Sequence, residues 1–353
     1  MSQRSVRRGV ALERNFLAGV RWTPVAVLTL ILVAVMVLAT GTGSVTIAPA
    51  KVLRAVWHGL TQNLDGTLDT IVWQIRLPRV LMAALVGGSL ALSGVAYQGI
   101  FRNPLADPYL LGVASGASLG AALAIVYGTT IPLLALLGVP LTAFLFSLAS
   151  VFLVIALARR GTTIPIVSLI LAGAVLGSSF SAATSFVMLV AQERAAGVLA
   201  WLLGSFGLSS WSKLVSVLPF MLVAGVAVMV SSRALNLLQL GDEQAAQLGL
   251  PVERFKFALI TVATLATAAA VSVSGIIGFV GLMVPHAVRL ALGPDHRTLV
   301  PTAALLGAVF MVLADLLART IIAPAEIPIG VITALVGGPV FLYLLKRQRR
   351  GAL

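Results

Sequence analysis

Acidic side chains are few in this 353-residue chain, and their positions limit the chemistry that it could perform. There are eleven Asp and Glu residues, and only Asp315 lies well inside a long apolar segment. Arg319 follows four residues later, so the two side chains share one face of a helix and can pair. A neutralised pair is typical of a structural bridge, whereas a proton-driven carrier needs acids in mid-membrane. The sequence therefore gives little support to a proton- or sodium-driven carrier or channel.

Motifs of energy conversion and catalysis are missing from the sequence. It has no G-x-x-x-x-G-K-[ST] loop, which is the usual cradle for ATP phosphates. It has no cysteine, and its three histidines and its acids do not fall at metal-ligand spacing. His286 precedes Arg289 by about one helical turn, and we interpret it as a structural histidine. We therefore expect no catalytic residue, metal or cofactor in this chain, and a membrane-embedded enzyme is disfavoured.

The composition predicts an all-α integral membrane protein. Hydrophobic residues make up 59% of the chain, charged residues only 10%, and the mean hydropathy is +1.06. An apolar helix needs about 20 residues to cross a bilayer. Ten segments reach or approach that length, near 24–40, 79–98, 109–127, 131–157, 164–190, 214–231, 257–274, 276–292, 301–320 and 328–345. They predict one transmembrane domain at 24–345, with tails at 1–23 and 346–353.

The basic residues predict which side of the membrane each connection faces. Membrane proteins carry an excess of Lys and Arg in short cytoplasmic loops. With both tails inside, only seven of the 24 basic residues lie outside: Lys51, Arg54, Arg76, Arg79, Arg194, Lys213 and Arg319. We therefore expect both termini in the cytoplasm. The scattered basic residues, which give a net charge of +13, fit this topology better than binding to nucleic acid.

The first apolar segment, 24–40, has two interpretations. It follows a basic stretch, as the core of a signal peptide does. Trp22 lies at its edge, where interface anchors are common, and many further spans follow. We interpret it as a retained first helix.

One polar stretch, 232–256, interrupts the apolar sequence on the predicted cytoplasmic side. Asp242 is a good N-cap residue, and Glu243 follows in the first turn, where an acid faces the positive helix end. Gly249 suits the C′ position, and Pro251 prevents continuation of the helix. The predicted helix has about two turns, which is too short to persist alone in water. We expect it to dock on another surface, and an ordinary cytoplasmic loop is the alternative.

Three arginines lie at the predicted outer face, against the charge bias of the membrane. Arg76 and Arg79 end a sizeable outer loop, predicted at 41–79, and Arg319 closes the ninth span. They can serve as snorkelling anchors. They can also form a cationic rim that docks an acidic soluble partner.

The predicted inner turn at 102–108 joins the second and third spans. Its Asn, Asp and two Pro residues favour a rigid bend. The residues are Asn103, Pro104, Asp107 and Pro108. Such a bend could brace the segment 232–256, or it could be a simple tight turn.

Five stretches between about Arg76 and Lys346 match one known pattern in the same order. They are RLPRVLMAALVGGSLALSGVAYQGIFRNPLADPYLLGVASGASLGAAL, LGDEQAAQLGLP, GIIGFVGLMVPHAVRL, DHR and EIPIGVITALVGGPVF. In these stretches the chain resembles the FecCD-type permeases, the membrane subunits of type II ABC importers for iron-siderophores, haem and cobalamin. The resemblance implies the type II ABC importer permease fold, with about ten transmembrane helices per subunit and a homodimer.

The same resemblance implies partners and site residues. Two cytoplasmic ATPase subunits would hold ATP and Mg, and a periplasmic or lipoprotein substrate-binding protein would deliver the chelate. That protein would dock on Arg76, Arg79 and Arg319. The ATPase coupling segment would comprise Leu240, Gly241, Asp242, Glu243, Ala245, Leu248, Gly249 and Pro251.

The resulting hypothesis is a permease in the bacterial cytoplasmic membrane that moves an iron-siderophore or haem by alternating access. A cobalamin permease is the alternative, and a stand-alone ion-driven transporter is less favoured. Chelates of this size are bound by the partner protein, so all three cargoes are compatible with the sequence.

Overall fold

The computed structural model describes residues 21–43, 45–159, 161 and 163–351, and the elements in these residues are all helices. Seven are long and apolar enough to cross a membrane: α2 (Trp22–Gly41), α5 (Leu77–Phe101), α7 (Pro132–Ala158), α8 (Ile166–Val190), α10 (Trp211–Val230), α13 (Val252–Ser274) and α15 (His296–Thr320). Three apolar helices are shorter or less regular: α6 (Val113–Tyr127), α14 (Val280–Leu292) and α16 (Ile329–Gly351). The ten correspond in order to the ten predicted segments, so the predicted fold class is confirmed.

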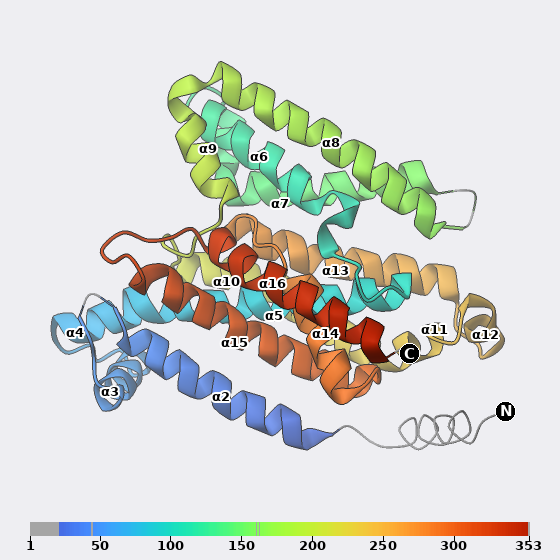
Figure 1. The fold of residues 1–353 in the computed structure, drawn as a ribbon. Helices are drawn as coiled ribbons and strands as arrows, with labels where there is room; N and C mark the ends of the chain where they lie inside the picture. The colour runs from blue at the N-terminus through green and yellow to red at the C-terminus, as the bar shows by residue number, and fades with distance from the viewer. Residues whose placement is uncertain (1–20, 44, 160, 162, 352–353) are drawn as a thin grey trace.

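Short helices gather at the two ends of the bundle (Figure 1). One end carries α3 (Pro49–Leu60), α4 (Gly66–Thr70), the 3-10 turn η3 (Gln192–Arg194) and α9 (Ala195–Leu202). The opposite end carries α11 (Ser232–Leu238) and α12 (Asp242–Gln247), together with the start of α2 and the end of α16. The first is the predicted outer end and the second the predicted inner end, and the two are named so below.

The predicted outer loop 41–79 is largely helical. This segment folds into α3, α4 and the π-helical turn η1 (Ile71–Arg76), which runs directly into α5. Val52 and Ala55 of α3 are three residues apart and pack with Ile47 and Val72 in a small cluster of their own. Helical spacing of apolar residues within a polar segment therefore produces a small cap on the bundle.

Helices α6 to α9 form a layer beside the rest of the bundle, drawn at the top in green (Figure 1). Within this layer α6 packs against α7 and α8. The main bundle centres on α5, which packs against α15, α13, α14 and α10. Helix α13 joins the two parts because it also packs against α7 and α6.

Backbone-to-backbone packing holds α5 against its neighbours. A Cβ at Gly94 would lie 1.8 Å from the carbonyl oxygen of Gly281 in α14. A Cβ at Gly87 would lie 2.2 Å from the carbonyl oxygen of Gly307 in α15. Small residues allow such an approach in a membrane, where helix and lipid are equally apolar. These glycines therefore bring α5, α14 and α15 into direct contact.

Two irregular segments, 102–112 and 275–279, precede the short helices α6 and α14. The first includes the 3-10 turn η2 (Pro108–Leu111), and the second separates α13 from α14, as the predicted break near Gly275 requires. The hydroxyl of Tyr109 donates to the carbonyl oxygen of Ile277 at 3.0 Å and joins the two. Irregular backbone at membrane depth is tolerated where protein or a cavity satisfies it.

Candidate functional site

The polar segment 232–256 folds as α11, α12 and the first turn of α13. Helix α12 ends in a Schellman motif, in which the N–H of Leu250 donates to the oxygen of Ala245 at 3.0 Å. The N–H of Gly249 donates to the oxygen of Ala246 at 2.9 Å. Gly249 has φ of +89°, a conformation that favours glycine. The prediction that Gly249 is the C′ residue is confirmed.

The prediction that the side chain of Asp242 caps α12 is wrong. Gly241 is the N-cap residue, with φ of +116°, and the N-cap makes no side-chain hydrogen bond. The carboxylate of Asp242 accepts a hydrogen bond from Lys256 Nζ at 2.5 Å and lies 3.8 Å from Arg102 Nη2. The Lys256 side chain is only 4% exposed, and a buried ammonium is costly without a paired acid. Asp242 therefore pairs with Lys256.

One face of α12 is packed and the other is open. Ala245 is fully buried in a cluster with Leu238 and Val252. Leu240 and Leu248 are exposed, at 47% and 61%, although both are large and apolar. Among the other predicted coupling residues, those on the exposed side are Glu243, Gly249 and Pro251. The segment therefore presents a small, partly apolar surface on a rigid helix.

Two side-chain hydrogen bonds to the backbone hold the inner turn 102–108. Asn103 Oδ1 accepts a hydrogen bond from the N–H of Leu105 at 2.9 Å. Asp107 Oδ1 accepts one from the N–H of Tyr109 at 2.7 Å and caps η2, which begins at Pro108. Since Arg102 also reaches Asp242, the turn lies directly against the segment 232–256.

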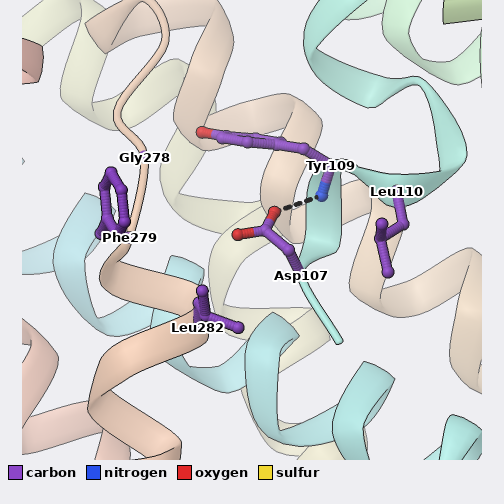
Figure 2. A pocket seen from close by; sticks show the side chains of 6 residues that line it. All are labelled: Asp107, Tyr109, Leu110, Gly278, Phe279 and Leu282. Carbon is purple, nitrogen blue, oxygen red and sulfur yellow. Dashed lines mark hydrogen bonds between the residues drawn. The ribbon is translucent and has the colours of Figure 1, made fainter. Parts of the chain in front are cut away.

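A cavity of about 400 Å³ opens between the turn and the start of α14 (Figure 2). Its lining is mostly apolar and has one carboxylate; the residues are Asp107, Tyr109, Leu110, Gly278, Phe279 and Leu282. In Figure 2 the Asp107 carboxylate is bonded to the N–H of Tyr109 and lies across from Phe279 and Leu282. A single carboxylate is no cage for a resident metal, and the described part of the chain holds no group of three His, Cys, Asp or Glu suited to one.

At the outer end, Arg79 lies at the centre of a charged network. Its Nη2 is 2.8 Å from Asp315 Oδ1, and its Nη1 is 2.7 Å from Glu326 Oε1. Arg319 Nε lies 3.5 Å from Asp315 Oδ2, so the predicted pair four residues apart is confirmed. The hydrogen bonds from Arg79 hold the pKa of Glu326 below its usual range, although partial burial opposes them. The network ties α5 to α15 and to the segment before α16.

Arg76 and Arg319 also donate to main-chain oxygens in the last turn of α2 and just after it. Arg76 is buried and donates to the carbonyl oxygens of Thr40 and Gly41 at 3.1 Å, and of Val45 at 2.7 Å. Arg319 donates to the oxygen of Thr42 at 2.9 Å and also to that of Ala39. The three predicted docking arginines thus come together, but each is bonded within the chain. Their docking role stays a prediction.

At the inner end, two residues at the start of α13 have partners that the sequence did not predict. Glu253 and Lys256 were included in the polar segment without a role, yet both bond to neighbouring elements. The sequence pattern that could have indicated these contacts is an acid and a base three residues apart at the start of an apolar helix. In the structure Lys256 is only 3% exposed, which is unusual for a lysine.

The ten apolar helices in the described residues are typical of a multi-pass membrane protein. The chain belongs to the FecCD transport family, whose family model matches residues 30–347. It is 43% identical to the hemin transport system permease protein HmuU of Yersinia pestis, over 84% of this chain and 88% of that protein. It is 42% identical to the cobalamin import system permease protein BtuC of Halobacterium salinarum, over 82% of this chain and 77% of that protein.

A solved structure supports the same fold. An inward-facing metal-chelate type ABC transporter matches with a TM-score of 0.81 and 35% sequence identity, over 92% of this chain and 98% of that chain. The chain is therefore an ABC transporter permease, and the predicted family is confirmed.

Proposed function

We propose that this chain is the permease subunit of an ATP-driven importer that moves a metal chelate, an iron-siderophore or haem, across the bacterial cytoplasmic membrane. It works as a homodimer, with two cytoplasmic ATPase subunits that hold ATP and Mg and with a periplasmic or lipoprotein substrate-binding protein. The permease itself needs no cofactor. The observation that carries this proposal is the family match over residues 30–347, joined to the exposed, rigid α12.

The segment 240–251 is the surface that couples to the ATPase. Its open face carries Leu240 and Leu248, which favour burial against a partner. Its packed face is fixed by Ala245 and by the Schellman motif, so a push on α12 moves the segment as a unit. The distribution of basic residues supports a cytoplasmic position for this end, with both termini on the same side.

Helix α8 supports both the homodimer and alternating access. Of the most apolar stretch of α8, 18 residues long, only 11% is buried within the subunit. Leu171 and Val175 are more than half exposed. A second copy can cover this face, and a helix with few contacts inside its own subunit can shift between two arrangements.

Transport in proteoliposomes tests the function. The permease is reconstituted with its ATPase and its binding protein, and uptake of haem, a ferric siderophore and cobalamin is measured with and without ATP. We expect ATP-dependent uptake of haem or the siderophore. Uptake of cobalamin alone would favour the alternative cargo, and uptake without the ATPase would reject the ATP-driven importer.

The coupling segment has its own test. Deletion of 243–248, or Gly249→Pro, should abolish transport and stimulated ATP hydrolysis while the bundle still folds, because α12 touches the core only at its packed face. Glu193→Ala, at the opposite end, is the control for loss of one exposed acid. Unchanged transport after the deletion would show that the segment is an ordinary loop.

Docking of the binding protein at the outer end is tested by two variants of one ion pair. Arg79→Ala should weaken binding of the binding protein to the permease in nanodiscs, because it removes a cation from the rim. Asp315→Asn disturbs the same internal network but keeps all three arginines. Equal losses in the two variants would assign these arginines a structural role only.

A further inference from the structure

The layer of α6 to α9 is joined to the segment 232–256 by a hydrogen bond at the inner end. The N–H of Ile164, in the turn before α8, donates to Glu253 Oε2 at 2.8 Å. Glu253 lies in the first turn of α13, directly after the exposed helix α12. The bond therefore connects elements that are 89 residues apart in sequence.

Glu253 is itself connected to α12 through a buried ammonium. Lys256 Nζ lies 3.9 Å from Glu253 Oε1 and 2.5 Å from Asp242 Oδ2. The lysine side chain is 4% exposed, so its charge depends on these acids, and Asp242 is the nearer of the two. These contacts form a series from Asp242 through Lys256 and Glu253 to the main chain of Ile164.

Ile164, the last residue in this series of contacts, directly precedes α8 and is expected to move with it. Ile164 is 6% exposed and packs in the main core, and Pro165 follows as the N-cap residue of α8. Because proline fixes its own φ, the backbone between Ile164 and α8 can change its conformation only a little. A displacement of Ile164 should therefore move the first turn of the helix. Beyond that turn most of α8 is exposed, whereas 67% of the apolar window of α13 is buried. Of these two helices, α8 has fewer contacts to hold it in place.

We propose that Glu253 is a positioning residue that transmits a displacement of α12 to the start of α8. In this role the carboxylate does not touch the cargo or the ATPase. It keeps the start of α8 in register with the coupling segment, so that both move together. The inference rests on the proposed coupling of α12 to an ATPase.

A single fluorophore on α8 tests this link. The chain has no cysteine, so Val167→Cys, at a position 69% exposed near the start of α8, gives one labelling site per subunit. An environment-sensitive bimane is attached, and the full complex in nanodiscs is compared without nucleotide and with a non-hydrolysable ATP analogue. We expect a spectral shift in the otherwise unchanged protein.

Two substitutions of Glu253 separate transmission from simple support. Glu253→Ala should remove most of the shift and lower the transport per ATP hydrolysed by about tenfold, the effect of losing a hydrogen bond to a charged acceptor. ATP hydrolysis itself should persist, since α12 is unchanged. Glu253→Gln retains an oxygen that accepts from Ile164, so it should restore most of the shift and of the transport. A merely structural role would lower hydrolysis and transport together.

The control is Glu193→Ala, which removes an exposed acid at the opposite end and should leave both readouts unchanged. A normal shift and normal transport per ATP in Glu253→Ala would overturn the proposal. If that variant does not fold, Lys256→Gln breaks the same series of contacts between Asp242 and Glu253. A normal shift in that variant would also overturn the proposal. Failure of the importer proposal is distinct, because the unsubstituted complex would then transport without the ATPase.

Discussion

Helices α5 and α8 are both 25 residues long and both apolar, yet they are held in opposite ways. In the helix that ends at Phe101, 83% of the most apolar window is buried, against 11% in α8. Helix α5 has glycine contacts with α14 and α15 and an arginine at its outer end that is paired with two acids. Helix α8 has no charged residue in its length. Helices of similar composition are therefore buried on most sides in one place and, in α8, packed on one side by α6 and α7 with the rest exposed.

This difference assigns separate tasks to the two parts of the bundle. A helix packed backbone to backbone on several sides resists displacement, because interiors are close-packed and shift between discrete arrangements rather than deform. A helix with few contacts in its own subunit depends on its ends and on its partners. The ends of α8, together with its contacts to α6, α7 and η2, therefore set its position.

The largest effect should come from Asp315, which ties α5 to α15. Asp315→Asn leaves the guanidinium groups of Arg79 and Arg319 without their shared, 1% exposed carboxylate. Loss of one partner of a buried ion pair costs about 3–5 kcal/mol, so the unfolding temperature in detergent should fall sharply. A matched loss from α8 is impossible because it has no charge. A shift of less than a degree or two would show that α5 is not fixed by this network.

A smaller effect should follow from crowding the glycine contacts. Gly94→Ala places a Cβ 1.8 Å from a main-chain oxygen of α14, and such overpacking costs about 1–3 kcal/mol. Gly177→Ala in α8 is the control, because its Cβ would meet nothing nearer than Ser115 Oγ at 3.5 Å. Thermal unfolding of the two variants measures the contrast. Equal destabilisation would remove the distinction between the helices.

Cysteine chemistry probes the same contrast without a loss of stability. Val175→Cys in α8 lies on an exposed face, at 66% exposure, whereas Val86→Cys in α5 is fully buried. We expect Val175→Cys to react with a membrane-permeant maleimide and to cross-link between the two copies of a homodimer, and Val86→Cys to remain unreactive. Reaction without cross-linking would place lipid, rather than a second copy, on this face.

Local chemistry is what made part of this structure predictable. The ten apolar segments follow from bilayer thickness, and the end of α12 follows from the glycine at C′, since both depend on neighbouring residues only. The helices within 41–79 were missed because that segment is polar overall. The cap role given to Asp242 failed because the helix begins at that residue and Gly241 takes the N-cap position, while the carboxylate bonds to Lys256, fourteen residues away.

Pairing over long sequence distances was beyond any local pattern. Arg79 meets Asp315 across 236 residues, and Glu253 meets Ile164 across 89. The outer arginines were expected to be either snorkelling anchors or a docking rim, and the acids that bind Arg79 come from distant parts of the same chain. The contrast between α5 and α8 was equally hidden, because apolar length predicts a span and says nothing about what covers it.

The smallest expected effect lies at the exposed edge of the network that holds α5. The Glu326 side chain is 42% exposed, and a surface pair of this kind contributes about 0–1 kcal/mol, so Glu326→Gln should barely lower the unfolding temperature at pH 7. Because Arg79 lowers the pKa of Glu326 in the folded state, the stabilisation is present above the unfolded value near 4.5 and is lost as the pH falls through the lower folded value. Unfolding temperatures of the unsubstituted protein and Glu326→Gln, measured between about pH 7 and pH 3, should therefore converge on acidification. A difference that grows as the pH falls would mean that Glu326 does not act through its charge, and that Asp315 alone pairs with Arg79.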